Sequence, residues 1–121
     1  MRTLEEADPE FHPYYEGVME KRDMAYHQGT VWTFPLGAYY LAYLKVHAYS
    51  ERAKQDVKEQ LEVLECALKE GCIGQLPEIY DGKNPVSSKG CFAQAWSVGE
   101  LLRVYEQIEK RRNRTWNLKG E

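Results

Sequence analysis

The most constraining feature of this sequence is residues 34–48, a stretch that is apolar or aromatic on nearly every side. A surface helix carries one apolar stripe, whereas a helix without a polar face belongs inside a larger body of protein. Pro35 suits the first turn of such a helix, because its missing N–H costs nothing there, and Thr33 can cap it. The sequence therefore predicts an inner helix that needs protein cover on all sides.

Two amphipathic helices are predicted after the inner helix. Residues 51–70 carry apolar side chains at steps of four, three and four, and Gly71 is the residue type that often ends a helix. Residues 92–111 carry a second apolar stripe of this kind. Three helices, one of which needs cover all round, make a poor core by themselves. We therefore expect the chain to be part of a larger helical fold, or to self-associate.

The remaining segments are predicted as loops. Residues 1–25 are polar and turn-rich, and residues 26–33 form a compact aromatic and polar loop. Residues 72–91 form a longer loop whose apolar side chains, such as Ile73, can pack it against the rest of the protein. A loop of this length is typically functional. The basic end of the chain, residues 112–121, is expected to fray.

Composition excludes several function classes. A chain of 121 residues with net charge -3 and a pI near 5.7 is not expected to bind nucleic acid. It contains neither a run long enough to span a membrane nor a secretory leader pattern, so we expect a cytoplasmic protein without membrane partners. Its three cysteines show no CxxC spacing and are expected to be reduced thiols packed as small apolar groups. No metal and no cofactor are predicted.

Helix direction predicts where functional side chains gather. If successive helices alternate in direction, the loops before the inner helix and before the last helix lie at the same end. Carbohydrate clefts use aromatic faces for stacking, and amides and carboxylates to bind hydroxyls. The candidates at that end are Tyr26, His27, Gln28, Trp32, Glu78, Tyr80, Asp81, Gln94 and Trp96.

Each candidate also has a structural interpretation. Glu78, in a turn, could hold and deprotonate a water as a general base, but turn carboxylates more often only bind backbone amides. His27 alone is more often a packed, hydrogen-bonded histidine, and Trp96 a core residue. Asp81 could be only a turn residue followed by Gly82 in the left-handed region.

Three ordered motifs carry a resemblance to a known family. They are YHQGTVW at residues 26–32, GQLPEIYDG at 74–82 and GCFAQAWSV at 90–98. Together they resemble the C-terminal signature of glycogen debranching enzymes, in the amylo-α-1,6-glucosidase domain. The resemblance extends from Arg2 to about Tyr105, and its specificity comes from the three motifs occurring in order.

The resemblance implies a fold. The family's glucosidase domain is an (α/α)6 barrel of the six-hairpin glycosidase type, in which inner and outer helices alternate. An all-α partial barrel that holds only the last inner and outer helices is therefore expected. Residues 1–121 would form a single segment, the C-terminal portion of an α-1,6-glucosidase domain.

The resemblance also implies a reaction, the inverting hydrolysis of α-1,6-linked glucose at the branch points of a glycogen-like α-glucan. It implies that Glu78 is the general base. The positions implied to bind sugar are His27, Gln28, Trp32, Gln94 and Trp96, with Tyr26 in the same motif.

The family's general acid, an aspartate, lies upstream of the matched region, and Asp81 is too close to Glu78 along the chain to replace it. The isolated chain is therefore expected to be inactive on a branched glucan until an upstream segment completes it. The alternative is a truncated, non-catalytic remnant that self-associates and retains carbohydrate binding.

Overall fold

The computed structural model of the chain describes residues 1–70 and 73–114. These residues are mostly helical and include one small antiparallel sheet, which the predicted all-α class omits. The helices are α1 (Met19–Gln28), α2 (Pro35–Val46), α3 (Glu51–Glu65), the 3₁₀ helix η1 (Cys66–Lys69) and α4 (Ala95–Arg114). The strands are β1 (Val31–Trp32), β2 (Ile79–Tyr80) and β3 (Ser88–Lys89), in the order β1-β2-β3.

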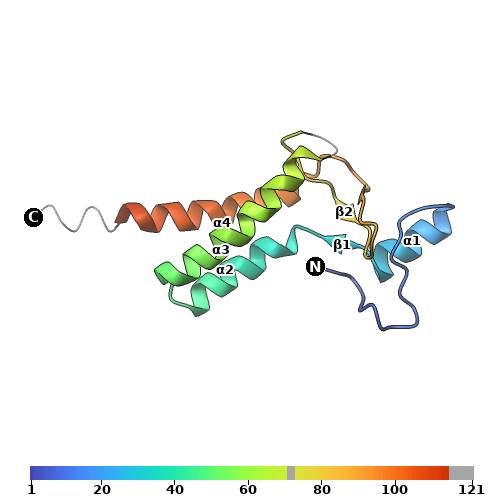
Figure 1. Cartoon of the computed structure of the whole chain (residues 1–121), viewed down its shortest axis with the longest axis horizontal. Helices are drawn as coiled ribbons and strands as arrows, with labels where there is room; N and C mark the ends of the chain where they lie inside the picture. Colours follow the sequence, from blue (N-terminus) through green and yellow to red (C-terminus); the bar gives the residue numbers. More distant parts are fainter. Residues whose placement is uncertain (71–72, 115–121) are drawn as a thin grey trace, which may run out of the picture.

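Helices α2 and α4 lie side by side and run in the same direction, while α3 returns the other way (Figure 1). The close approach of α2 to α4 depends on Gly37, since a Cβ there would lie 2.6 Å from the Cβ of Glu100. The sheet and α1 lie at the end where α2 and α4 both begin (Figure 1). The predicted alternation of helix direction is therefore confirmed.

The start of α2 is partly as predicted. Pro35 occupies the first turn, but Phe34 before it is already helical, and no side chain caps the helix. The buried Thr33 hydroxyl has no hydrogen-bond partner among the described residues. The prediction that Thr33 caps α2 is wrong, because a capping hydroxyl accepts a hydrogen bond from an amide of the first turn and that of Thr33 accepts none.

Helix α3 begins as its sequence indicates and ends early. The Ser50 hydroxyl accepts a hydrogen bond from the Ala53 amide at 3.3 Å, and the buried face holds Ala53, Val57 and Leu61. The α-helix ends at Glu65 and tightens into η1, as helix C-termini often do. Gly71, predicted to end it, lies outside the described residues.

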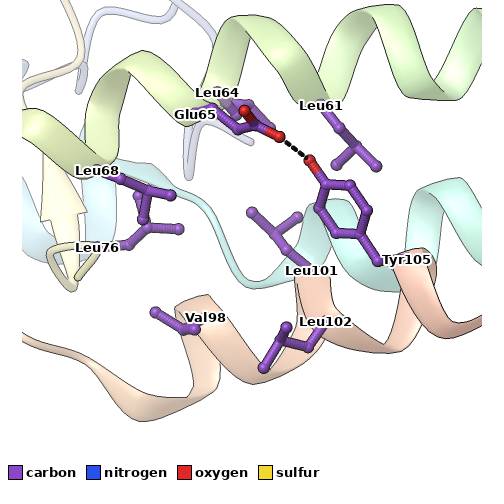
Figure 2. A pocket seen from close by; sticks show the side chains of 9 residues that line it. All are labelled: Leu61, Leu64, Glu65, Leu68, Leu76, Val98, Leu101, Leu102 and Tyr105. Atoms are coloured by element: carbon purple, nitrogen blue, oxygen red, sulfur yellow. Dashed lines mark hydrogen bonds between the residues drawn. The ribbon is translucent and has the colours of Figure 1, made fainter. Parts of the chain in front are cut away.

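One apolar core joins the three longer helices to the loop before β2. Its buried members are Tyr40, Leu44, Ala53, Val57, Leu61, Leu76, Leu101 and Val104. Beside it, an apolar pocket opens between α3 and α4 (Figure 2). The Tyr105 hydroxyl donates a hydrogen bond to Glu65 at 2.6 Å across this pocket. Burial is the larger cause, and this hydrogen bond the second, of a raised pKa of Tyr105.

Only one side of α2 is covered within the described part of the chain. Tyr40 and Leu44 are buried, whereas Tyr39 is 51% exposed and Val46 is 80% exposed. The helix predicted to need cover on all sides therefore presents apolar surface to solvent. None of the helices in residues 1–70 and 73–114 has the length and hydropathy of a bilayer span.

Two predicted loops contain regular structure. Residues 19–28 form α1, whose single buried residue is Ala25; its few apolar side chains form no stripe that helix periodicity could detect. The segment 26–33 is therefore the last turn of α1 followed by β1. Helix α4 begins at Ala95, three residues later than predicted, and extends to Arg114; residues 115–121 of the predicted frayed tail lie outside the described residues.

Side-chain burial corrects two further predictions. Ile73 is 87% exposed and does not pack its loop down, whereas Leu76 and Ile79 are buried. Cys66 and Cys91 are free thiols but exposed, so they do not serve as small core residues. Cys72 lies outside the described residues.

Candidate active site

The sheet brings the two candidate loops together. Strand β1 pairs antiparallel with β2, with Trp32 opposite Ile79 and Val31 opposite Tyr80, and β3 pairs with the other edge of β2. Because Glu78 immediately precedes β2, this pairing brings its segment beside that of Trp32. The predicted convergence of residues 26–33 with the loop 72–91 is confirmed through the described residues of that loop.

Glu78 has protein donors on both carboxylate oxygens. Its Oε1 accepts a hydrogen bond from the Tyr26 hydroxyl at 2.5 Å, and its Oε2 accepts one from the Cys91 amide at 3.0 Å. The Glu78 amide in turn donates to the Cys91 carbonyl at 2.8 Å. The carboxylate is therefore half-buried and held between α1 and the turn that follows β3.

Aromatic rings extend from Glu78 towards the start of α4. The Tyr26 ring contacts the Trp32 ring edge-on with centroids 4.8 Å apart, and Trp32 lies 6.0 Å from Trp96. Phe34 stacks on Trp96 at 4.7 Å and an interplanar angle of 24°. These four rings form the aromatic wall of the site.

An open groove of about 530 Å³ runs along this wall. Its lining residues are Met1, Arg2, Thr3, Tyr26, His27, Trp32, Phe34, Pro35 and Trp96. The first three residues reach the groove because Arg2 forms an antiparallel bridge with Val31. The groove is large enough for a glucose-sized ring and offers the flat apolar faces on which such rings stack.

Burial keeps the Tyr26 hydroxyl protonated. Desolvation first, and then the hydrogen bond to Glu78, raise the pKa of Tyr26 to about 12. The hydroxyl is therefore a hydrogen-bond donor to Glu78 throughout the neutral range. In the described part of the chain no group of His, Cys, Asp and Glu side chains could hold a metal ion.

A comparison with known families bears directly on this arrangement. The family model described as Amylo-alpha-1,6-glucosidase matches residues 1–103. The chain belongs to the amylo-alpha-1,6-glucosidase family. No curated protein and no solved structure matches the chain.

The region matched to the amylo-alpha-1,6-glucosidase family contains both candidate loops and the entire aromatic wall. Its members are glycoside hydrolases of the glycogen-debranching type. Residues 104–121 lie beyond the match.

The structure places the other candidates of this amylo-alpha-1,6-glucosidase chain less centrally. The side chain of His27 lines the groove but is 68% exposed and lies 3.7 Å from the Asp23 carboxylate. The backbone of Gln28 accepts a hydrogen bond from the His12 amide, and the backbone of Gln94 accepts one from Ser97 at the start of α4. The predicted site residues that do not line the groove are Gln28, Glu78, Tyr80, Asp81 and Gln94.

Asp81 and Tyr80 support the loops. Asp81 is 4% exposed, accepts a hydrogen bond from the Tyr15 amide at 3.0 Å and lies 3.7 Å from the Lys89 ammonium. The prediction that Gly82 adopts the left-handed region is wrong, because Gly82 has no positive φ. Glycine is required there for a different reason: a Cβ would lie 2.0 Å from the Gly29 carbonyl oxygen. Burial raises the pKa of Tyr80.

Sequence reasoning missed three contributors to the amylo-alpha-1,6-glucosidase site. Phe34 completes the aromatic wall, Arg2 lines the groove from the N-terminal segment, and the Cys91 amide binds Glu78. Phe34 follows Trp32 by two residues, so its aromatic character was an available signal. Backbone pairing of residues far apart in the chain leaves no comparable signal for Arg2 and Cys91.

Proposed function

We propose that this chain supplies the general base and the sugar-binding wall of an inverting amylo-α-1,6-glucosidase that removes α-1,6-linked glucose from the branch points of a glycogen-like α-glucan. The observation that carries the proposal is the position of Glu78: it does not itself line the aromatic groove, but its carboxylate accepts a hydrogen bond from Tyr26, which does. Membership of the family supports the same reaction.

In this mechanism the sugar ring stacks on the aromatic wall while Glu78 removes a proton from water. The water oxygen forms a bond to the anomeric carbon from the face opposite the leaving group, so the configuration inverts. A second carboxylic acid must protonate the departing glycosidic oxygen, and an inverting pair is roughly 6.5–9.5 Å apart.

The general acid is expected from helices that precede this segment in the family. Asp81 is unsuited to the role, because its carboxylate is buried and engaged with the Tyr15 amide and Lys89. The exposed Tyr39 and Val46 on α2 are apolar surface that further helices could cover. We therefore propose that α2 and α4 are inner helices and α3 an outer helix of a partial (α/α)6 barrel, within a single segment formed by residues 1–121.

A substrate that needs no general acid tests the base alone. In α-glucosyl fluoride the C–F bond pair leaves with fluoride without protonation, while Glu78 takes a proton from the attacking water. We expect the chain to release β-glucose from this substrate but to be inactive on a branched glucan. Glu78→Gln should lower the rate of fluoride release about 10²–10⁴-fold.

Glu62→Gln is the matched control, since Glu62 lies on α3 with a side chain that is 57% exposed. Its rate should equal that of the unmodified chain. Fluoride release that is absent, or equal in the Glu78→Gln and Glu62→Gln variants, would show that Glu78 is not the general base.

The alternative function is a non-catalytic remnant that self-associates and binds carbohydrate. The exposed apolar side of α2 favours it, because a second copy could cover Tyr39 and Val46. Sedimentation of the chain with maltotriose distinguishes the two: a stable oligomer that binds the sugar but does not cleave α-glucosyl fluoride indicates the remnant. In either case Trp32→Ala should weaken binding, and unchanged affinity would remove Trp32 from the cleft.

A further inference from the structure

The contacts of Glu78 suggest a more specific role for Tyr26 than sugar binding. An ionised carboxylate has about four lone-pair positions for hydrogen bonds. Two are occupied, one on each oxygen, by the Tyr26 hydroxyl at 2.5 Å and the Cys91 amide at 3.0 Å. One position on each oxygen therefore remains for a water molecule.

The turn after β3 is shaped around this carboxylate. Gly90 has φ +69°, in the left-handed region that favours glycine, and a Cβ there would lie 2.6 Å from Glu78 Oε2. The reciprocal backbone bond from the Glu78 amide to the Cys91 carbonyl, at 2.8 Å, fixes the same turn. Gly90 thus allows the Cys91 amide to reach the carboxylate.

Tyr26 is itself held from several sides. Its ring meets Trp32 at 4.8 Å, His27 at 5.2 Å and Tyr15 at 6.1 Å between centroids. Its carbonyl accepts a hydrogen bond from the Thr30 hydroxyl at 3.0 Å, at the end of α1. A ring packed in this way directs its hydroxyl to Glu78 and leaves little freedom for that hydroxyl to turn towards a sugar.

We propose that Tyr26 is a positioning residue for Glu78: together with the Cys91 amide, which Gly90 admits, it clamps both carboxylate oxygens and fixes the direction in which Glu78 accepts the proton of the attacking water. This inference rests on the proposed function, because it concerns the same base. Misplacing a reacting group by about 1 Å can cost about 10²-fold in rate, so the clamp would affect kcat strongly.

The test is α-glucosyl fluoride hydrolysis by Tyr26→Phe, with Tyr14→Phe as the matched control. The Tyr14→Phe substitution also removes one short hydrogen bond, which the Tyr14 hydroxyl donates to the Asn84 carbonyl at 2.6 Å. Tyr14 is not hydrogen-bonded to Glu78. We expect kcat to fall about 10- to 100-fold in Tyr26→Phe with KM nearly unchanged, because the stacking ring remains. Tyr14→Phe should change neither kcat nor KM.

A second pair of variants tests the clamp from the other oxygen. Gly90→Ala and Gly74→Ala both place a side chain at positive φ, but the Gly74 position, with φ +77°, has open space around it. We expect only Gly90→Ala to lower kcat. Equal kcat in the two glycine variants, or in the two tyrosine variants, would overturn the positioning role.

Failure of the proposed function gives a different result. If hydrolysis is independent of Glu78, the base assignment fails, whatever the tyrosine variants do. The contact itself is checked without activity by ¹³C NMR of labelled tyrosine: Glu78→Gln should lower the pH at which Tyr26 titrates. An unchanged Tyr26 titration would show that the hydroxyl and the carboxylate are not joined, and would overturn the inference.

Discussion

The helical half of the molecule and its sheet end are held together by different interactions. Helices α2, α3 and α4 meet through apolar side chains such as Leu44, Val57 and Leu61, none more than 1% exposed. The sheet end, formed by α1 and the three strands, is joined by hydrogen bonds between distant segments. Its buried polar residues are Thr30, Thr33 and Asp81.

The helical half therefore mainly stabilises the fold, whereas the sheet end mainly positions the side chains of the site. Apolar burial is non-directional and roughly proportional to area, so it drives the helices to pack but tolerates small shifts between them. Hydrogen bonds require defined distances and angles, so they fix where a carboxylate lies relative to a ring. The two halves meet where Leu76 enters the core and the buried Ser97 hydroxyl donates to the Pro77 carbonyl at 3.0 Å.

Removing apolar contact in the helical half should have the largest effect on stability. Leu61→Ala is expected to lower the free energy of unfolding by about 2–5 kcal/mol, since the side chain is 1% exposed and a cavity would remain. Val63→Ala on the same helix, 73% exposed, is the control and should change stability little. Chemical denaturation measures both; equal losses would mean that the core does not lie on this face of α3.

Removing a polar contact at the sheet end should cost less but act on the site. Asp81→Ala leaves the Tyr15 amide without its acceptor and Lys89 without its carboxylate, which is expected to cost about 1–3 kcal/mol. Asp81→Asn keeps an acceptor and should cost less. Hydrogen exchange at the Tyr15 amide should accelerate only in the alanine variant, and equal acceleration in both would show that charge, not the hydrogen bond, holds the loop.

The same comparison explains what the sequence could predict. The α3 stripe of Val57 and Leu61 and the all-round apolar pattern of α2 are periodic features, and periodicity follows directly from helix geometry. The parallel course of α2 and α4 followed from the assumption that successive helices alternate in direction. Helices α2, α3 and α4 were therefore predicted nearly in full, apart from a start of α4 placed three residues early and an end of α3 that tightens into η1.

For the sheet end, the sequence predicted which residues gather there but not the strands or the helix that hold them. Strands of two residues are too short for an alternating pattern, and α1 has no apolar stripe. Glu78, Trp32 and Trp96 could be chosen because carboxylates and aromatic rings carry recognisable chemistry. The Tyr26 bond to Glu78 could not be predicted, since it depends on the register in which β1 and β2 pair.

Two helical glycines test how closely α2 and α4 approach each other near the ends where both helices begin. Gly37→Ala should destabilise the fold by about 1–3 kcal/mol, because its Cβ would clash with Glu100 and push α2 away from α4. Gly99→Ala, with nothing within 4 Å of its added Cβ, should instead stabilise α4 by about 0.5–1 kcal/mol. Thermal unfolding of the two variants should shift in opposite directions; a shared direction would mean that helix propensity, not close approach, dominates at both positions.

The smallest expected effect is the contribution of Tyr26 to the pH dependence of stability. Because the pKa of Tyr26 is raised from 10 to about 12 on folding, mainly by burial, the folded state favours the protonated hydroxyl. Its stabilising contribution is present below pH 10 and is lost as the pH rises towards 12. Tyr26→Phe should therefore lose less stability than the unmodified chain between pH 10 and pH 12, while the raised pKa values of Tyr40, Tyr80 and Tyr105 act equally in both proteins. The difference should be below about 1 kcal/mol, since Tyr26 is partly exposed and solvent screens its interaction with Glu78. Denaturation at the two pH values measures it, and identical losses would place the Tyr26 hydroxyl in solvent rather than against the carboxylate.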